Sequence, residues 1–366
     1  MQFRKNKNLL YIQYNIKNTS VVQKFINFSI FLSKFCYNII MKIVILDGNT
    51  LSPQNQISKD IDFSVLENIA GTKNEVIFYE RTNENQTVSR VADSQIILVN
   101  KVLITKEVMD LCPNLKYIGL CSTGTNVVDL DYAHKKGITV TNVPSYSTAG
   151  VAQLVFSFIL EFTNHVKLHS DDVHSGGWIN SPDFCYRKEP LTELLGKTLG
   201  IVGFGSIGKQ SAKIASAFGM NVICFTRSPE KLKEFPEIQA VSFEELCKNS
   251  DFITLHCPLT EQTKNLINKD SISKMKKSCV VINTARGPIV NEDDMAFALK
   301  NNQIAGFACD VVSVEPMKKD NPLLNCPNCL ITPHIAWAAL ETRQRLFQEI
   351  YKNLESFLLG KARNIV

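Results

Sequence analysis

The chain carries an arginine, a glutamate and a histidine, each shortly after an apolar run typical of a buried strand: Arg286 after 279–282, Glu315 after 304–309 and His334 after 329–331. Ligands of an open parallel sheet bind at the carboxyl ends of its strands, so we expect the three side chains on one side. A guanidinium can hold a carboxylate, an imidazolium can protonate a carbonyl oxygen, and a carboxylate can keep the imidazole charged and oriented. The set predicts reduction of a 2-keto acid by a nicotinamide, although each residue alone could be structural.

A glycine-rich turn upstream of these residues predicts a dinucleotide site. Residues 199–208 read LGIVGFGSIG, which is an apolar strand followed by GxGxxG, and a helical stretch continues to Phe218. Gly203 permits the tight turn, Gly205 lets the backbone approach a pyrophosphate, and Gly208 lets the helix pack closely on the strand. The free N–H groups at the start of the helix favour an anion. We therefore expect NAD(H) or NADP(H) as the cofactor.

The end of the next strand, 221–225, bears on which dinucleotide is preferred. Proteins that bind NAD usually carry an acidic residue there for the ribose hydroxyls, whereas this chain has Thr226, Arg227 and Ser228. Arg227 can pair with a 2′-phosphate and Ser228 can donate to it. Alternatively, Arg227 is a solvated loop residue and Thr226 binds the ribose of NAD. We expect both cofactors to bind, with a slight preference for NADP.

Alternating strands and helices must position these groups, and 366 residues suit two domains. Short β-branched runs form a first series before residue 141 and a second series from Leu199, which predicts an α/β fold with parallel sheets. A helix over 148–168 is apolar on nearly all sides. We interpret it as the contact of a homodimer, with burial inside one chain as the alternative. The further expected elements are strands at 42–46, 75–79, 96–99, 117–120, 138–140 and 252–256 and a final helix over about 340–359.

Charge and cysteine content exclude several classes of function. The net charge is +5, but residues 1–40 hold six basic and no acidic residues, and the remainder has a net charge of −1. A nucleic-acid partner is therefore not expected. We interpret residues 1–40 as an extension before a natural start at Met41, and its apolar stretch is too short for a membrane span. Eleven cysteines without regular spacing indicate reduced thiols in a cytoplasmic protein without a metal site, and we read Cys326 and Cys329 as two loop cysteines.

Five motifs, in this order and spacing, resemble the D-isomer-specific 2-hydroxyacid dehydrogenase family: GFGSIG, HCPLT, NTARGPIV, DVVSVEP and ITPHIAW. The resemblance covers about residues 41–366 and implies two Rossmann-like domains. A flavodoxin-like substrate domain would be split in sequence between 41–141 and 334–366, and a doubly wound NAD(P)-binding domain would span 142–333. The resemblance places the active site in an interdomain cleft, with hinges near Asn142 and His334.

The resemblance also implies a role for each site residue. His334 would be the general acid and base, paired with Glu315, and Arg286 would bind the substrate. The backbone amides around Ser122, Thr123 and Gly124 would hold the substrate carboxylate. The implied contacts with the cofactor, besides the three glycines and the 226–228 segment, are Ser206, Ile207, Cys257, Pro258, Thr284, Ala285, Asp310 at the nicotinamide carboxamide, and His334.

Within the family, the segments MKIVILDGNTLSP, TGTNVVDLDYA, SPDFC and ITPHIAWA are most similar to bacterial glycerate dehydrogenases, or hydroxypyruvate reductases. This implies reduction of hydroxypyruvate to D-glycerate, or of glyoxylate to glycolate. Two departures are Thr226, where many relatives have Asp, and Tyr186, Arg187 and Lys188, where aromatic residues follow SPDFC in that subgroup. The alternatives are 3-phosphoglycerate, D-lactate or a phosphonate as substrate, with Arg187 and Lys188 near a phosphate, or a dinucleotide-sensing co-repressor of the same fold.

Overall fold

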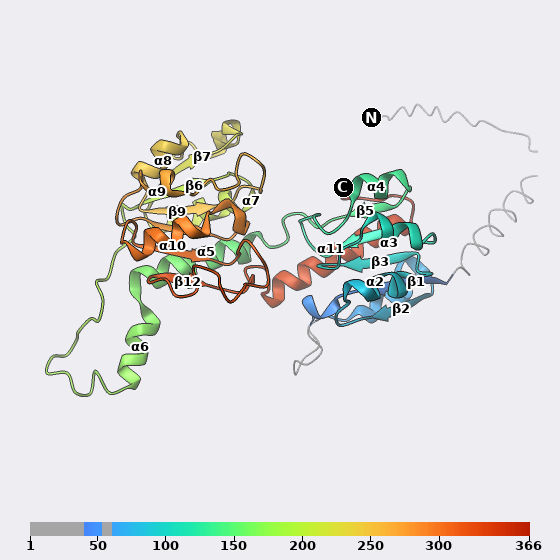
Figure 1. Cartoon of the computed structure of the whole chain (residues 1–366), viewed down its shortest axis with the longest axis horizontal. Helices are drawn as coiled ribbons and strands as arrows, with labels where there is room; N and C mark the ends of the chain where they lie inside the picture. The colour runs from blue at the N-terminus through green and yellow to red at the C-terminus, as the bar shows by residue number, and fades with distance from the viewer. Residues whose placement is uncertain (1–39, 53–60) are drawn as a thin grey trace, which may run out of the picture.

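The computed structural model of the chain describes residues 40–52 and 61–366. The expected N-terminal extension, residues 1–40, lies outside this description except for its last residue. The described chain forms two lobes, each built on its own parallel sheet (Figure 1). Most helices that cover each sheet come from the stretches between its strands, as expected for βαβ units.

The first lobe contains a five-stranded parallel sheet in the order β2-β1-β3-β4-β5, the flavodoxin-like arrangement. Its two faces bury separate apolar clusters. The final helix, α11 (Leu340–Leu358), covers one face through Leu346, Ile350 and Leu354, so the end of the chain returns to the first lobe. The strands are β1 Met41–Ile45, β2 Asn74–Phe78, β3 Ile96–Val99, β4 Tyr117–Leu120 and β5 Thr139–Thr141. The shorter elements are η1 Gly48–Thr50, η2 Phe63–Gly71, α2 Glu84–Val91, α3 Lys106–Leu111 and α4 Leu130–Lys135.

The second lobe contains a seven-stranded parallel sheet in the order β12-β11-β10-β9-β6-β7-β8, which is the doubly wound arrangement around the first strand of the lobe. The strands are β6 Thr198–Val202, β7 Asn221–Phe225, β8 Gln239–Ala240, β9 Phe252–Leu255, β10 Val280–Asn283, β11 Gly306–Cys309 and β12 Cys329–Ile331. The helices are α5 Thr148–Asn164, α7 Ser206–Ala217, η3 Pro229–Glu234, α8 Phe243–Asn249, α9 Lys269–Ile272, η4 Gly287–Ile289 and α10 Glu292–Lys300.

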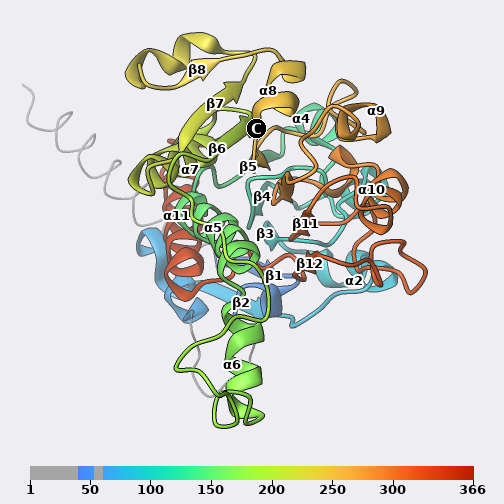
Figure 2. The ribbon, with the colours of Figure 1, turned by 90° about the vertical axis from the view of Figure 1, so that its left-hand side faces the viewer.

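The prediction of one helix over 148–168 is wrong at its C-terminal end. Helix α5 ends at Asn164, and His165 adopts a left-handed conformation with φ of 47°. A separate helix, α6 (Val166–His174), then extends away from the body of the second lobe in both views (Figures 1 and 2). The change of direction follows from His165, because a left-handed residue ends the α-helical hydrogen-bond pattern.

The apolar character of α5 is explained within the chain. Val155, Phe156 and Ile159 are buried in the same cluster as α7 and the second sheet. The apolar side chains of α5 are therefore no evidence for a contact between two subunits. Eight exposed large apolar side chains lie in the projecting arm, which we define as residues 166–195. They are Val166, Leu168, Val173, Trp178, Ile179, Phe184, Leu191 and Leu195. Among the described residues, no helix is long and apolar enough to cross a membrane.

Candidate active site

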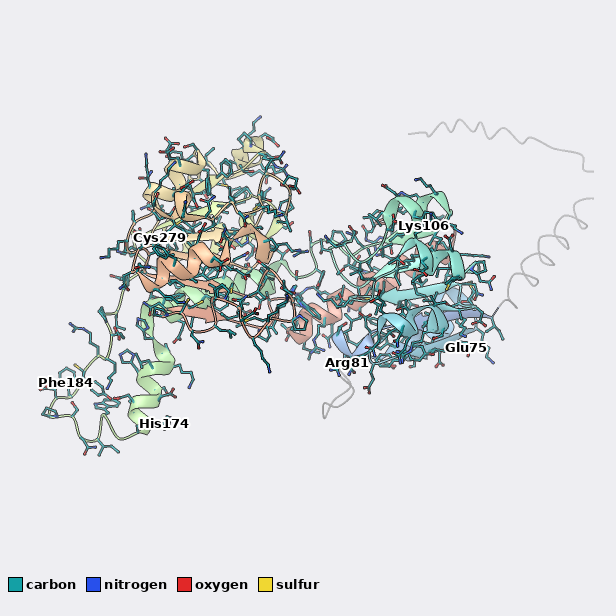
Figure 3. The ribbon with its side chains drawn as sticks, in the orientation of Figure 1. Glu75, Arg81, Lys106, His174, Phe184 and Cys279 are labelled. Carbon is teal, nitrogen blue, oxygen red and sulfur yellow. The ribbon has the colours of Figure 1, made fainter. Side chains whose placement is uncertain are left out.

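The carboxyl ends of the two sheets face each other. Glu75 near the start of β2 lies on the outer side of the first lobe, whereas Arg81, just after β2, lies toward the second lobe (Figure 3). Cys279, just before β10, lies on the far side of the second lobe, so β10 runs toward the first (Figure 3). Because every strand in each sheet is parallel, the loops that follow β1, β3 and β4 face those that follow β10, β11 and β12.

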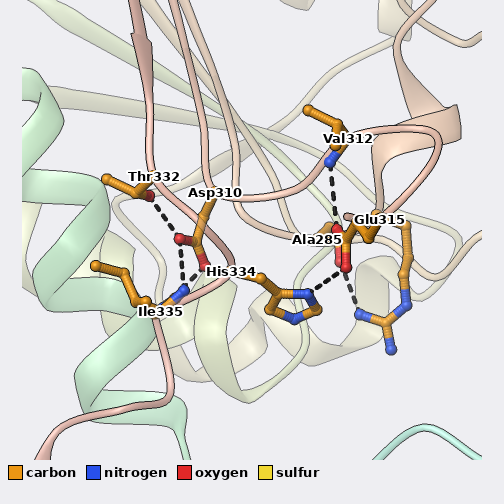
Figure 4. A network of polar contacts seen from close by, with 9 residues as sticks. Ala285, Asp310, Val312, Glu315, Thr332, His334 and Ile335 are labelled. Carbon is orange, nitrogen blue, oxygen red and sulfur yellow. Dashed lines mark hydrogen bonds and ion pairs between the residues drawn. The ribbon is translucent and has the colours of Figure 1, made fainter. Parts of the chain in front are cut away.

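The expected histidine–glutamate pair is formed. His334 Nδ1 lies 2.7 Å from Glu315 Oε2, and the Val312 N–H donates to Glu315 Oε1 at 3.3 Å (Figure 4). Burial acts to raise the pKa of Glu315, but the hydrogen bond and positive charge of His334 outweigh it and hold that pKa below its usual value. Glu315 is therefore an anion at neutral pH, able to stabilise the imidazolium form of His334.

Asp310 holds the backbone around the histidine. Its carboxylate accepts hydrogen bonds from the Thr332 hydroxyl at 2.5 Å and from the N–H groups of Ile335 and Ala336, both at 2.8 Å (Figure 4). His334 lies inside this clamp with φ of 56°, which is an uncommon conformation for a residue other than glycine. Asp310 is 1% exposed. Three acceptor positions of the Asp310 carboxylate are already used by these hydrogen bonds. Its expected contact with the nicotinamide carboxamide stays a prediction.

Arg286 lies beside the loop that follows β4. A Cβ atom added to Gly124 would come within 3.0 Å of Arg286 Nη2, so the two lobes meet at this point. The arginine donates to the Ala285 carbonyl at 2.7 Å, and its second guanidinium nitrogen has no hydrogen bond in residues 40–52 and 61–366. The N–H groups of Ser122, Thr123 and Gly124 also have no acceptor in these ranges. The arrangement leaves a cation and a row of backbone donors free for a carboxylate.

The glycine turn has the geometry that a pyrophosphate needs. Gly203 has φ of 97°, and a Cβ there would lie 2.8 Å from the His256 carbonyl. A Cβ on Gly208 would lie 2.3 Å from the Gly203 oxygen, whereas Gly205 faces open space. Ser206 and Ile207 form the first turn of α7, whose N–H groups are the free donors of a helix start.

The other expected cofactor residues lie at the neighbouring strand ends. Ser228 N–H donates to Thr226 Oγ1 at 3.1 Å, which closes the turn after β7. Burial raises the pKa of the Cys257 thiol, and the Arg227 charge partly opposes this, which places Arg227 near the end of β9. Pro258 follows in the same exposed loop, and Ala285 N–H donates to the Asn283 side chain at 3.0 Å.

Thr284 supplies an independent sign of a ligand. Its hydroxyl is buried without a hydrogen-bond partner, one of only two such side-chain atoms in the described parts of the chain. Buried polar groups are normally hydrogen-bonded. An unsatisfied hydroxyl after β10, at the same edge of the sheet as the glycine turn, together with open space at Gly205, fits a bound dinucleotide.

Sequence reasoning missed two polar residues at the opposing sheet edge. Asp47 follows β1 and is 6% exposed, and its carboxylate accepts from the N–H groups of Asn100 and Lys101 after β3. The strand-end rule that selected Arg286 would have found both Asp47 and Lys101 if it had been applied to the first series of strands. In the residues that the structure describes, no group of His, Cys, Asp and Glu side chains could hold a metal ion.

Comparisons with known proteins agree with this geometry. Residues 156–336 match the family described as D-isomer specific 2-hydroxyacid dehydrogenase, NAD binding domain. The chain is 43% identical to a hydroxypyruvate reductase of Blautia hydrogenotrophica, over 89% of this chain and 99% of that protein. It is 39% identical to a glycerate dehydrogenase of Methylorubrum extorquens, over 79% of this chain and 90% of that protein. The solved structure of the acyclic imino acid reductase Bsp5 with NADPH and D-Arg superposes with a TM-score of 0.76 at 30% identity. The superposition covers 89% of this chain and 100% of that protein.

Proposed function

The chain belongs to the D-isomer-specific 2-hydroxyacid dehydrogenase family and is an NAD(P)-dependent oxidoreductase, and we propose that its substrate is hydroxypyruvate, with glyoxylate as a second substrate. The products would be D-glycerate and glycolate. The observation that carries the proposal is the 2.7 Å contact between His334 and Glu315 at the sheet edge where Arg286 meets Gly124. This edge can hold a small carboxylate and protonate the neighbouring carbonyl oxygen.

Each residue of this edge has a defined part in the proposed mechanism. Arg286 and the amides of Ser122–Gly124 bind the carboxylate and orient the carbonyl. A nicotinamide cofactor, when bound at the glycine turn, would supply the hydride. His334, as imidazolium, donates its Nε2 proton to the carbonyl oxygen, and Glu315 stabilises the charge until the transfer. In the reverse direction neutral His334 accepts the hydroxyl proton.

A panel of keto acids tests the substrate directly. Initial rates are measured by absorbance with hydroxypyruvate, glyoxylate, pyruvate and 3-phosphohydroxypyruvate, each with NADH and NADPH. The proposal predicts the highest kcat/KM for hydroxypyruvate and measurable reduction of glyoxylate. A higher kcat/KM for 3-phosphohydroxypyruvate, or for pyruvate, would contradict the assignment, and so would the absence of turnover with all four.

We propose that both cofactors serve and that NADPH is slightly favoured. The turn at Thr226–Ser228 contains no carboxylate to repel a 2′-phosphate, and Arg227 is exposed there with no ion pair in the described residues. A guanidinium in this position can pair with a phosphate. The two arms of the same panel measure the preference.

We propose that the substrate domain comprises residues 41–141 and 334–366 and the NAD(P)-binding domain residues 142–333. Support comes from α11, which covers the first sheet, and from Asn142 at the crossing between the lobes. Asn142 donates to the Thr123 carbonyl at 2.8 Å and accepts from the Asn353 side chain at 2.9 Å. The lobes would close over the substrate about Asn142 and His334.

We propose a homodimer in which the arm, residues 166–195, packs on a second copy. Ile179 and Phe184 are 86% and 88% exposed, and apolar side chains this open favour burial against a partner. Light scattering after size exclusion tests this. The wild type should have the mass of a dimer, and Phe184→Ser with Ile179→Ser should shift it toward a monomer. Phe297→Ser, at a 59% exposed site on α10, is the control. A monomeric wild type would contradict the proposal.

A cytoplasmic location is also proposed. The ten cysteines in the described parts of the chain are all free, and most are buried. Reduced thiols are typical of proteins in a reducing compartment. Fractionation of the source cells with immunodetection of the chain tests the location, and recovery outside the cytoplasm would contradict it.

A further inference from the structure

A lysine at the facing edge of the first sheet is not used by the proposed mechanism. Lys101 directly follows Asn100 at the end of β3, and its side chain is exposed. Within residues 40–52 and 61–366 its ammonium group has no hydrogen bond and no ion pair. An unpaired cation at the carboxyl end of a parallel strand lies where ligands of this fold bind.

The backbone of Lys101 is fixed although its side chain is free. The buried Asp47 carboxylate accepts from the Asn100 N–H at 2.9 Å and from the Lys101 N–H at 2.5 Å. The Asn100 side chain donates to Thr50 Oγ1 at 2.9 Å, which adds a second anchor to the same loop. The position of Lys101 is therefore set by the first sheet, as a substrate-binding residue requires.

Lys101 lies within electrostatic reach of the catalytic pair. Burial is the largest influence on the pKa of Glu315 and raises it. His334, Val312 and Lys101 lower this pKa, and the contribution of Lys101 is the smallest of the three. Glu315 belongs to the second lobe and Lys101 to the first. Lys101 and Glu315 therefore follow strands of the two facing sheets and lie close enough for their charges to interact.

The neighbouring strand defines which part of a substrate Lys101 would meet. Strands β3 and β4 pair in parallel, with Val99 opposite Leu120. The loop 122–124 after β4 would hold the carboxylate at C1, and adjacent strands lie about 4.8 Å apart. A cation one strand away from the carboxylate site is displaced sideways by about 4.8 Å, a little more than the three bonds that join C1 to an oxygen on C3. It would meet a group on C3.

We propose that Lys101 is a specificity-determining residue that donates a hydrogen bond to an oxygen substituent on C3 of the substrate. This inference rests on the proposed function, because hydroxypyruvate carries such an oxygen and glyoxylate has no C3. A hydroxyl and a phosphate share the chemistry that a lysine recognises, since both accept a hydrogen bond from an ammonium group.

The test compares substrates with and without this oxygen in a variant that removes the ammonium. Lys101→Met should lower kcat/KM for hydroxypyruvate about 10-fold or more, which is the usual loss for one charged hydrogen bond. Its kcat/KM for glyoxylate should stay within about 2-fold of the wild type, and Lys101→Arg should recover part of the loss for hydroxypyruvate. Lys116→Met is the matched control, because Lys116 is exposed at the opposite end of β4 and should change neither value.

The outcomes separate this inference from the proposed function. A wild type that reduces both keto acids, with an unchanged ratio of their kcat/KM values in Lys101→Met, overturns the role of Lys101 alone. An equal loss for both substrates also overturns it, because the lysine would then act on the carboxylate that they share. A loss of kcat/KM for 3-phosphohydroxypyruvate that exceeds the loss for hydroxypyruvate would support the contact. It would also show that Lys101 binds a phosphate on C3 more strongly than a hydroxyl. A wild type that reduces neither overturns the proposed function and this inference with it.

Discussion

Replacement of Glu315 by glutamine removes a charge from the catalytic pair with little change in shape. The Glu315 carboxylate accepts from His334 Nδ1 at 2.7 Å, and the two side chains are 34% and 30% exposed. A hydrogen bond between charged groups contributes about 1.5–3 kcal/mol, and partial exposure places this pair toward the lower limit. A loss of about 1.5 kcal/mol in the stability of the imidazolium corresponds to about one pH unit.

Glu315→Gln should therefore shift the pH dependence of the reaction. Reduction needs protonated His334, so the pH at which its rate falls to half should move down by about one unit. At a pH above both midpoints the reduction rate should be roughly tenfold lower than in the wild type. Oxidation needs neutral His334, so the rise of its rate with pH should begin about one unit lower. Initial rates from pH 5 to pH 9 measure both pH dependences, with hydroxypyruvate and NADH for reduction and with D-glycerate and NAD for oxidation.

A control separates this effect from a general loss of structure. Glu292 accepts from the Ser313 N–H and the Asn321 side chain in the same region, without contact to His334 in the described chain. Glu292→Gln should leave both pH midpoints unchanged. If Glu315→Gln has the pH profile of the wild type in both directions, the assignment of Glu315 to the catalytic pair is refuted.

Three further substitutions test other parts of the site. Arg286→Lys should raise KM for the keto acid about 10-fold with a smaller change in kcat, because lysine cannot bind a carboxylate through two parallel hydrogen bonds; an unchanged KM in steady-state kinetics would count against it. Thr226→Asp should lower kcat/KM for NADPH about 10-fold and spare NADH, since a carboxylate repels the 2′-phosphate; equal losses with both cofactors would argue against this location of the ribose. Burial lowers the pKa of His256 to about 3, and its Nε2 lies between the hydroxyls of Ser211 and Thr254. The unfolded chain therefore binds a proton that the folded chain does not, below about pH 6.5, and the free energy of unfolding should fall by at most about 2 kcal/mol from pH 7 to pH 5. His256→Gln should lose this part of the decrease in urea unfolding, and an identical decrease in both proteins would disprove it.

The strands could be located from the sequence because they are short, apolar and β-branched. Each run expected for the two sheets lies within about two residues of an observed strand. Strand β8 was missed, since Gln239 and Ala240 are exposed and carry no apolar pattern. The end of α5 was missed as well, because His165 adopts its left-handed conformation without the glycine or proline that usually marks such a turn.

The candidate site was predictable only in part. The strand-end rule predicts the side on which Arg286, Glu315 and His334 lie, and the glycine turn predicts the phosphate site. The clamp made by Asp310 could not be predicted, because its partners are backbone N–H groups 25 and 26 residues away. The loop 122–124 was reached only through the family resemblance, since backbone donors leave no residue type to search for.

The proposed mechanism needs His334 for the transfer of the proton but not for the binding of the cofactor. Turnover of hydroxypyruvate and the Kd of NADH, the latter from nicotinamide fluorescence, should be measured on one preparation of His334→Gln. The variant should turn over at least about 100-fold more slowly than the wild type, and its Kd for NADH should lie within about 2-fold of the wild-type value. Near-normal turnover in His334→Gln would show that His334 is not the proton donor.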